Sequence, residues 1–462
     1  MLRNIFQTLC IFCLVSLLAL QASASQKKNH NILMIIVDDL RTQLGCYGHT
    51  ETLSPQIDRI ASEGTLFETA YVQVPVCGAS RASMMTGLYP TPSRFVTYYS
   101  SVNIDAPGIP DIPGHLKAHG YTTISNGKIY HQKEDCTNSW DEISRPPVFR
   151  VYLKPENQKL EGKKQAAYEM ADVADDAYPS GIMANKIIQD LREAKKSGKP
   201  FFITAGFTKP HLPFNAPKKY WDLYNPKQLV IPPSELPVGA PKNAYHKFGE
   251  LRSYSDTPKA GPVSEEQALR LIHGYHASVS YTDAQVGKVL DHLESLGLSE
   301  NTIVVLMGDH GYSLGEHGLW CKHSTFDVAT KTPLIIRAPN MPGNNTVDGL
   351  VEFIDIFPTL TDLANIDSPD QLAGMSLKPL LKDGSLPARS AVFPRYHSAE
   401  AIRTDQFTLT QWYNKKGDFF AEMLYDNIND PDETRNLARL KDYSDIRRNL
   451  EIQLVKHMRT RK

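Results

Sequence analysis

Residues 31–37 read Asn-Ile-Leu-Met-Ile-Ile-Val, and two aspartates, Asp38 and Asp39, follow directly. A continuous apolar run of this length is typical of a strand that is buried on both faces of a parallel sheet. Similar runs alternate with segments of helical periodicity, at residues 65–72, 121–125, 201–207, 302–307 and 333–336. This alternation predicts the α/β class, with a large, mostly parallel (mixed) central sheet sandwiched by helices. In such folds, functional side chains lie beyond the carboxyl ends of the strands.

Start and stop residues mark several helices. The longest pattern spans residues 264–296 and begins with a predicted capping box of Ser264 and Gln267. Another helix is expected to begin at Ser54 and Pro55, which supply an N-cap and a first helical position. Further helical segments are expected at residues 111–119 and 180–196.

The first 24 residues predict a secretory signal peptide. Arg3 precedes an apolar run at residues 9–20, and Ala22-Ser23-Ala24 has the small-x-small pattern of a cleavage site. The run is shorter than the roughly 20 apolar residues that a membrane-spanning helix needs, although an uncleaved anchor remains the alternative. We therefore expect a secreted or periplasmic protein with no membrane contact once the signal is removed.

The sequence changes character after residue 381. Residues 382–385, Lys-Asp-Gly-Ser, have the composition of a linker. Short strand-like runs follow at residues 390–393, 400–404, 407–412 and 422–425, and a helical pattern covers residues 443–456. We expect a small C-terminal subdomain in which a helix packs on an antiparallel sheet. The predicted division is a signal peptide at 1–24, a main domain at 25–383 and the C-terminal subdomain at 384–462.

The composition predicts a folded globular protein with no nucleic-acid partner. Of the 462 residues, 41% are hydrophobic and 22% are charged. This is enough apolar material to offset conformational entropy, and it excludes a disordered, collagen-like or short disulfide-scaffold protein. The 50 lysines and arginines are matched by 51 aspartates and glutamates, so the formal net charge is −1. Such a balance does not favour a nucleic-acid-binding stripe or a polybasic membrane patch.

Four cysteines remain after the signal peptide: Cys46, Cys77, Cys136 and Cys321. None of them belongs to a Cys-x-x-Cys pair, so a structural zinc site is not expected. One disulfide among Cys46, Cys136 and Cys321 is compatible with an exported protein, but the sequence does not assign it.

Two pairs of residues that are able to bind a metal follow predicted strands. Asp38-Asp39 ends the first strand, and Asp309-His310 comes after the strand at residues 302–307. If these strands are neighbours, three carboxylates and one imidazole meet in one place. Such carboxylates repel one another unless a cation compensates them, and oxygen ligands favour a hard ion such as Ca²⁺ or Mg²⁺. The histidine keeps zinc and manganese open as alternatives.

Cys77 lies where a helix is expected to begin. A helix N-terminus lowers a thiol pKa and stabilises anions, and Arg81, one turn further on, is placed to pair with an oxyanion. The alternative interpretation is a small buried residue without chemistry. Basic residues follow several other predicted strands, namely Lys128, His131, His211 and Lys322. Their repeated placement after strand ends indicates that they share one anion-binding site.

These residues also carry a family resemblance. Cys77-Gly78-Ala79-Ser80-Arg81, with Thr86-Gly87 after it, resembles the type I sulfatase signature Cys-x-Pro/Ala-x-Arg. Other segments similar to sulfatase motifs are residues 37–39, 54–61, 127–131 and 308–311. The sequence resembles the iduronate-2-sulfatase branch especially closely at residues 209–214, 314–318 and 326–330. The resemblance covers about residues 31–363, and residues 424–437 are similar to the C-terminal sulfatase subdomain.

The resemblance implies an alkaline-phosphatase-like fold and a sulfuric ester hydrolase. In this family a formylglycine-generating maturation enzyme oxidises the signature cysteine, so Cys77 would become the nucleophile as a hydrated aldehyde. One Ca²⁺ ion would be bound by Asp38, Asp39, Cys77, Asp309 and His310. Charge on the transferring group would be neutralised by Arg81, Lys128 and Lys322. His131 would act as the base and His211 as the acid near the leaving oxygen.

The implied substrate is a sulfated carbohydrate. A 2-O-sulfated uronic acid residue of a glycosaminoglycan is favoured, and another sulfated polysaccharide is the alternative. Residues 136–178 and 220–262 are expected to select the substrate, because loops carry specificity on a fixed scaffold. Tyr47, Tyr98 and Tyr99 are candidates for lining a sugar subsite.

Two other functions stay open. A phosphodiesterase or phosphatase of the same superfamily would normally have Thr or Ser in the position of Cys77. A catalytically silent sulfated-glycan-binding protein would keep Cys77 as an unmodified thiol. The residues of the site, and not the fold, separate these possibilities.

Overall fold

The computed structural model describes residues 29–146, 151–160 and 165–461. The predicted signal peptide lies outside these residues. Among the described helices, none combines the length and the apolar character needed to cross a membrane. The four described cysteines are free thiols, so the disulfide that the sequence left open is not formed between them.

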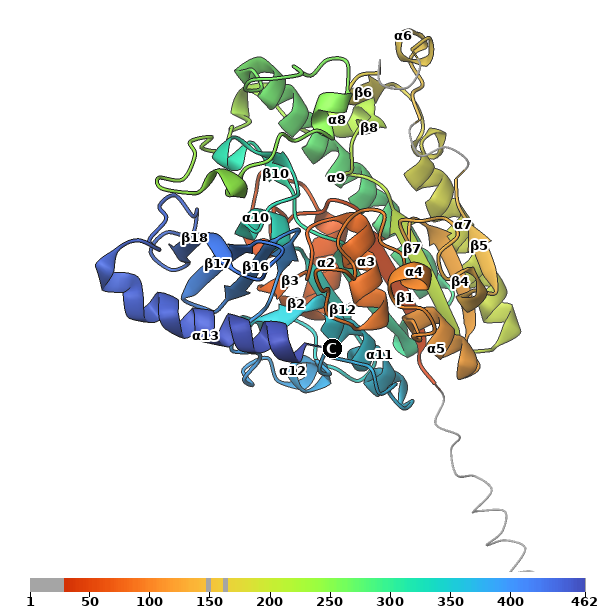
Figure 1. Ribbon diagram of the computed structural model, residues 1–462. Coiled ribbons are helices and arrows are strands. Elements are labelled where there is room, and N and C mark those ends of the chain that lie inside the picture. Colours follow the sequence, from red (N-terminus) through yellow and green to blue (C-terminus); the bar gives the residue numbers. More distant parts are fainter. Residues whose placement is uncertain (1–28, 147–150, 161–164, 462) are drawn as a thin grey trace, which may run out of the picture.

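An eight-stranded mixed sheet forms the centre of the main domain (Figure 1). Its strands, in spatial order, are β13 (Asn345–Val347), β2 (Thr65–Phe67), β12 (Leu334–Arg337), β9 (Thr302–Gly308), β1 (Asn31–Val37), β7 (Phe201–Phe207), β4 (Thr122–Gly127) and β5 (Glu142–Ser144). The strands from β9 to β5 are all parallel, whereas β12 runs antiparallel to both of its neighbours. The predicted α/β class with a mostly parallel central sheet is therefore confirmed.

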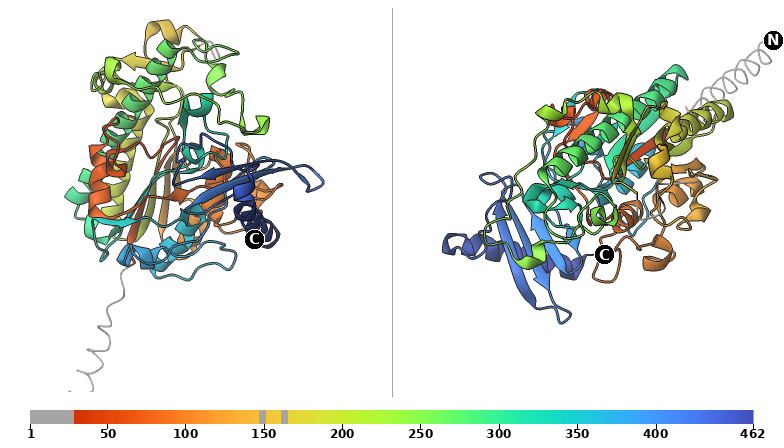
Figure 2. Two further views of the ribbon diagram at one scale, coloured as in Figure 1. Left: turned by 90° about the vertical axis from the view of Figure 1, so that its left-hand side faces the viewer. Right: turned by 90° about the horizontal axis from the view of Figure 1, so that it is seen from above.

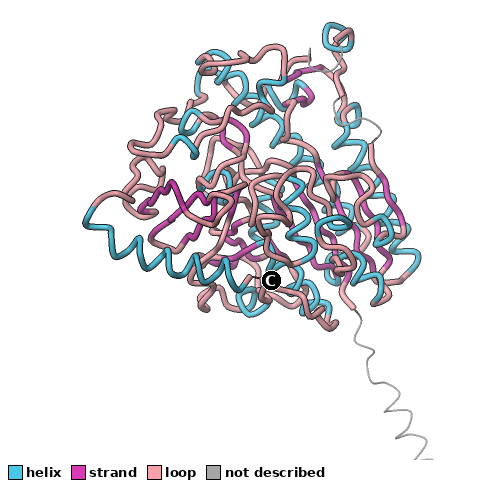
Figure 3. The backbone as a smooth tube through the Cα atoms, in the orientation of Figure 1, coloured by secondary structure: helices cyan, strands magenta, loops and turns pink. Residues whose placement is uncertain are grey.

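Helices cover both faces of this sheet (Figure 2), and Figure 3 shows the strands between them. Successive residues of a strand point to opposite faces. Ile32 and its alternate neighbours in β1 accordingly pack on one side, and Leu33 and its alternates pack on the other. The first side is covered by α3 (Cys77–Thr86), α5 (Ile112–Ala118) and α11 (Ile356–Ala364). The second is covered by α2 (Pro55–Glu63), α7 (Pro179–Ser197) and α9 (Glu265–Ser295).

Shorter elements connect these parts. They are β3 (Ala70–Tyr71), α4 (Val102–Asp105), α6 (Pro155–Gln158), β6 (Tyr168–Ala171), β8 (Phe214–Pro217), α8 (Lys218–Trp221), β10 (Ser313–Leu314), β11 (Trp320–Cys321), α10 (Asp327–Thr330), β14 (Val351–Glu352) and α12 (Lys378–Lys382). The strand expected at residues 65–72 is divided into β2 and β3, which belong to different sheets.

The start of α2 differs from the prediction. Pro55 takes the first helical position, but Ser54 makes no side-chain cap hydrogen bond. Asp283 of α9 has this role instead, because its carboxylate accepts hydrogen bonds from the backbone N–H groups of Gln56 at 3.0 Å and Ile57 at 2.8 Å. Burial raises the pKa of Asp283 to about 7. This cap comes from a residue more than 200 positions away in the chain, so the sequence around the start of α2 does not predict it.

The C-terminal subdomain has its own antiparallel sheet and core. The sheet contains β15 (Arg395–Tyr396), β16 (Ala399–Arg403), β17 (Phe407–Tyr413) and β18 (Phe419–Asp426). α13 (Ser444–Thr460) packs on it, and Leu450 and Leu454 of this helix join Leu409 and Leu424 of the sheet in one apolar cluster. The predicted sheet and helix are confirmed, although the strand expected at 390–393 is only an isolated bridge at Val392. The division at residue 383 stays a prediction.

Two glycines bring β7 and the end of β4 into close contact. A Cβ atom on Gly206 would lie 2.4 Å from the carbonyl oxygen of Lys128, which is closer than real atoms approach. Gly127 has a φ of +76°, a backbone conformation that a side chain disfavours. The backbone that presents Lys128 at the edge of the sheet therefore requires glycine at both positions.

We expect Gly206→Ala to lower the free energy of unfolding by about 1 to 3 kcal/mol, because the added methyl overpacks this contact. Urea unfolding followed by circular dichroism measures the change. Gly249→Ala is the matched control, since its methyl group would meet no atom within 4 Å. Equal stability of the two variants would contradict the proposed role of this contact.

Candidate active site

The predicted functional residues gather at one edge of the central sheet. Asp38, Lys128, His211 and Asp309 come at or shortly after the carboxyl ends of β1, β4, β7 and β9, which lie side by side. Cys77 is the first residue of α3 on one face of the same sheet. The hydroxyl of Ser80 donates to the carbonyl oxygen of Asp309 at 2.5 Å, which fixes the start of α3 to the end of β9.

Four of the five predicted metal ligands form a single cluster. The ligand atoms of Asp38, Cys77, Asp309 and His310 all lie within 4.8 Å of one another. The Cys77 Sγ atom is 3.1 Å from His310 Nε2 and 3.4 Å from the Asp38 carboxylate. The two carboxylates and the imidazole have no exposed surface, and Cys77 is 3% exposed.

Positive side chains pair with these buried carboxylates. The Arg81 guanidinium donates to Asp309 at 2.8 Å and lies 3.5 Å from Asp38. It also donates to the carbonyl oxygens of Lys128 and Ile129, so Arg81 connects α3 with the segment after β4. The Lys128 ammonium contacts Asp38 at 2.5 Å. Burial disfavours the Asp38 carboxylate, but the surrounding positive charges, with Lys128 first among them, hold its pKa well below the ordinary value.

Asp39 belongs to a neighbouring group instead of the cluster of four. Its carboxylate lies 2.9 Å from the Lys322 ammonium, and the same ammonium contacts Glu250 at 2.9 Å. Glu250 also contacts His211 Nε2 at 2.8 Å. Asp39, His211 and Glu250 thus form a second group of potential ligands within 4.8 Å. Burial raises the pKa of Asp39 despite the charge of Lys322.

Glu250 was missed by the sequence analysis. It lies in the segment 220–262, which was assigned to substrate choice, and no local pattern distinguishes it from other glutamates there. Its importance depends on contacts with two residues that are 39 and 72 positions away in the chain. Those contacts exist only in the folded protein.

The expected lowering of the Cys77 pKa is not observed. Burial raises the pKa of this thiol well above its ordinary value, and the Asp38 charge raises it further. The favourable effect of a helix N-terminus, about 0.3 to 1 kcal/mol, is too small to offset removal from water. Cys77 is therefore a protonated thiol in this structure, and its unmodified form is a poor nucleophile.

His131 is neutral in its surroundings. Burial lowers its pKa to about 4, and the nearby Lys128 charge contributes to the shift. The Nδ1 atom of His131 is buried without a hydrogen-bond partner among the described residues. A neutral imidazole with a vacant nitrogen is able to accept a proton.

A cavity of about 800 Å³ opens above Cys77. The predicted residues Cys77, Lys128, His131, His211 and Lys322 all line it, whereas the buried Arg81 does not. Tyr98 also lines the cavity, and the ring of the exposed Tyr99 packs on it at 4.0 Å. Tyr47 is absent from this wall and donates a hydrogen bond to the carbonyl oxygen of Phe67.

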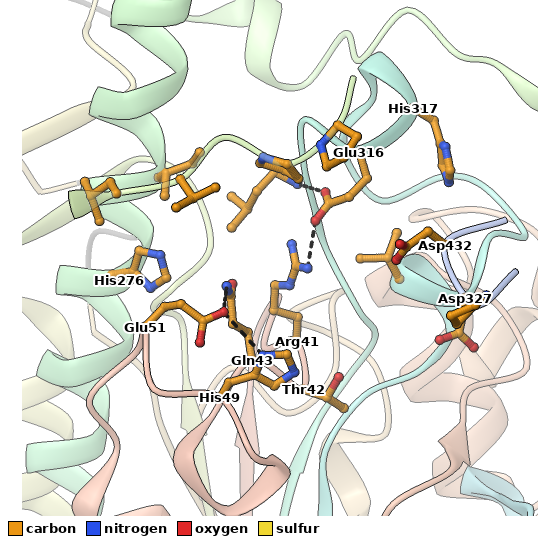
Figure 4. A pocket seen from close by; sticks show the side chains of 18 of the residues that line it. Arg41, Thr42, Gln43, His49, Glu51, His276, Glu316, His317, Asp327 and Asp432 are labelled. Carbon is orange, nitrogen blue, oxygen red and sulfur yellow. Dashed lines mark hydrogen bonds and ion pairs between the residues drawn. The ribbon is translucent and has the colours of Figure 1, made fainter. Parts of the chain in front are cut away.

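A second, larger cavity of about 1110 Å³ is lined by other residues (Figure 4). Arg41 and Glu316 form an ion pair at 2.7 Å on its wall, and His276 and Glu51 lie nearby. Neither group of potential metal ligands found in the described residues belongs to this wall. The cavity above Cys77 is therefore the better candidate for an active site.

Comparisons with known proteins identify the family of this chain. The family model described as Sulfatase matches residues 30–366, and the model described as N-sulphoglucosamine sulphohydrolase, C-terminal, matches residues 315–460. Iduronate 2-sulfatase of Homo sapiens is 36% identical over 386 residues, which cover 73% of this chain and 70% of that protein.

Two solved structures have the same fold. One is a protein in complex with its substrate D-glucosamine-2-N,6-O-disulfate, with a TM-score of 0.77, 24% identity and coverage of 94% of this chain and 98% of the other. Another is the phosphonate monoester hydrolase of Silicibacter pomeroyi, with a TM-score of 0.78, 21% identity and coverage of 94% and 96%. Because the sulfatase model spans most of the chain, and its signature cysteine lies among the acidic and basic residues described above, the protein belongs to the type I sulfatase family of sulfuric ester hydrolases.

Proposed function

We propose that this protein releases sulfate from a 2-O-sulfated uronic acid residue of a polysaccharide or of its oligosaccharides, with a formylglycine made from Cys77 as the nucleophile. The observation that carries the proposal is the position of Cys77. It lines a cavity, in contact with the Asp38 and His310 side chains, and Lys128 and Lys322 line the same cavity. Membership of the sulfatase family and the chemistry of this site agree with each other.

The buried cluster fits a divalent cation. Asp38 and Asp309 offer carboxylate oxygens, His310 offers an imidazole nitrogen, and residue 77 would offer an oxygen after conversion. We propose Ca²⁺ held by these four residues, with the adjacent Asp39 as a fifth ligand. Together the bound ion and the formylglycine would supply the Lewis acid and the nucleophilic hydroxyl.

The chain's own cations bind and orient the sulfate group. Lys128 and Lys322 both face the cavity beside Cys77 and provide ammonium N–H donors for the sulfate oxygens. Arg81 lies behind the carboxylates and has no exposed surface. We propose that Arg81 keeps Asp38, Asp309 and the Lys128 segment in position and that its charge acts on the sulfate through space.

Two histidines move protons. His131 is neutral with an unpartnered Nδ1 atom, so it is suited to accept a proton at residue 77. The Nε2 atom of His211 contacts Glu250 at 2.8 Å at the cavity wall, and its Nδ1 atom contacts the carbonyl oxygen of Leu212 at 2.6 Å. We propose that the leaving oxygen takes the place of Glu250 at Nε2 when the substrate binds, and that Nε2 then donates its proton to this oxygen. Glu250 holds the imidazole ring in position until the substrate arrives.

The remaining proposals concern substrate and maturation. The similarity to iduronate 2-sulfatase favours a glycosaminoglycan uronate. We propose that residues 1–24 direct export, that residues 25–383 form the catalytic domain, and that residues 384–462 form the C-terminal subdomain. A formylglycine-generating enzyme would act on the Cys77 to Arg81 signature, with Ala79 in the position where proline is usual.

The first experiment tests the nucleophile. We expect a peptide mass spectrum across residue 77 to show formylglycine in protein produced together with a maturation enzyme, and we expect this protein to release sulfate from 2-O-sulfated uronate oligosaccharides. Cys77→Ala is the control and should release none. An intact thiol together with tight glycan binding would favour the silent binding protein. Hydrolysis of phosphonate or phosphate esters in preference to sulfate esters would favour the other superfamily activity.

Lys128→Ala is expected to lower kcat/KM for sulfate release by about 10²- to 10³-fold, because it removes a charge positioned for the reacting group. Steady-state sulfate release measures the effect, and thermal unfolding checks that the fold is retained. Lys416→Ala, which removes an exposed lysine in the turn between β17 and β18, should behave as wild type. Unchanged turnover of folded Lys128→Ala would refute this role.

Asp309→Asn is expected to raise the Ca²⁺ concentration that gives half-maximal activity, because an amide oxygen replaces a charged ligand. Activity is titrated with Ca²⁺ after chelation, and Asp291→Asn on the surface of α9 is the matched control. A calcium dependence equal to that of wild type would mean that Asp309 is no ligand. If the activity of chelated wild-type protein returned with another divalent ion but not with Ca²⁺, the metal would be that other ion.

A further inference from the structure

The cavity above Cys77 contains more positive charge than the reacting sulfate requires. Lys133, Arg145 and Lys247 line it in addition to Lys128 and Lys322. Among the described residues of its wall, Glu250 is the one carboxylate, and it is already paired with Lys322 and His211. Lys128 is paired with Asp38 beneath the cavity, whereas Lys133, Arg145 and Lys247 form no ion pair with any described residue.

Arg145 is placed at the functional edge of the sheet. It follows β5 directly, and β5 runs parallel to β4, whose end carries Lys128. Neighbouring strands lie about 5 Å apart, so the backbone of Arg145 lies one strand further along the sheet than the end of β4. This places a guanidinium beside the reaction centre, on the side away from β1.

The Arg145 guanidinium has no partner among the described residues. It takes part in no ion pair, and its Nε atom is buried without a hydrogen bond. A guanidinium offers five N–H donors, and leaving a buried donor unsatisfied is costly. Burial lowers the pKa of Arg145, although the charges of Glu134 and Asp135 oppose that shift.

Asp135, the buried acid whose charge acts on Arg145, is already engaged by other groups. The Asp135 carboxylate accepts hydrogen bonds from the Ser101 hydroxyl at 2.8 Å and from the backbone N–H groups of Val102 and Asn103 at 2.9 and 3.0 Å. Asp135 therefore fixes the start of α4. A structural role for Arg145 would require a group that it holds, and the described residues provide none.

We propose that Arg145 binds a second anionic group of the substrate while the reacting sulfate lies against residue 77. The group is a carboxylate or a second sulfate, both of which match the planar fork of a guanidinium with two parallel hydrogen bonds. The proposal rests on the proposed function, and it adds that the site selects substrates with two negative groups on the same or adjacent sugar residues. Arg145 is then a determinant of specificity that takes no part in bond breaking.

The test measures the activity of four proteins on four substrates. The proteins are wild type, Arg145→Gln, Arg145→Lys and the control Arg439→Gln, which changes an exposed arginine. The substrates are a 2-O-sulfated uronate disaccharide, the same disaccharide with its carboxyl reduced to an alcohol, the carboxyl-reduced disaccharide with an added second sulfate, and 4-methylumbelliferyl sulfate. For Arg145→Gln we expect KM to rise about 10- to 100-fold on the intact disaccharide with little change in kcat, because a charge-assisted contact is lost. Activity on the aryl sulfate should be unchanged.

Each outcome decides the proposal. A loss confined to the carboxylate substrate, or to the substrate with a second sulfate, supports the role and identifies the group. Arg145→Lys should recover part of the affinity, because it keeps the charge without the fork. An equal loss on all four substrates, or no loss on any, overturns the role. If wild type releases no sulfate from any substrate, the proposed function fails. Calorimetric titration of the disaccharide then tests Arg145 separately, and equal affinities of wild type and Arg145→Gln overturn its role.

Discussion

Buried negative charge at the carboxyl edge of the sheet is the constraint on which the rest of the site depends. Asp38, Asp39 and Asp309 have no exposed surface, and buried carboxylates are tolerated only when they are paired and hydrogen-bonded. Three cations supply the pairing, and each comes from a different part of the fold: Arg81 from α3, Lys128 from the end of β4 and Lys322 from the segment after β11. These elements must therefore keep their positions relative to β1 and β9. Displacement of Arg81 or Lys322 would remove the closest cation from Asp309 or Asp39, and displacement of Lys128 would leave Asp38 with Arg81 alone, so the fold and the site are stabilised by the same contacts.

The same environment determines what Cys77 is able to do. A helix N-terminus favours an anion, but burial and the Asp38 charge raise the pKa of the thiol, and the effect of burial is the larger one. An unmodified cysteine at this position is thus a proton-bearing thiol among carboxylates. The wall of the same cavity also carries a neutral histidine, His131, and the ammonium groups of Lys128 and Lys322.

Charge in this protein is local. The chain has a net charge of only −1, yet among the described residues five lysines and arginines and a single carboxylate line the cavity above Cys77. Attraction of an anionic substrate therefore depends on short-range contacts inside a partly desolvated cavity, where salt screens them less than it screens exposed charges. Several of these cations belong to segments outside the central sheet, as Lys133 and Lys247 do. Substrate choice can thus change without disturbing the buried ion pairs beneath.

The sequence by itself determined the elements with strong local signals. Seven consecutive buried positions in β1 require an uninterrupted apolar run, and the aspartates after β1 and β9 mark the places where those strands leave the core. The start of α3 at Cys77 and the C-terminal sheet with its helix were predictable for the same reason. Only the tertiary structure decided which distant groups meet. Asp283 caps α2 in place of Ser54, Arg81 is buried behind the carboxylates, and Glu250 joins Lys322 to His211. Arg145 lies beside the cavity without a partner among the described residues. Local patterns report burial and backbone conformation, whereas these contacts depend on the packing of segments that lie far apart in the chain, and packing leaves no periodic trace in the sequence.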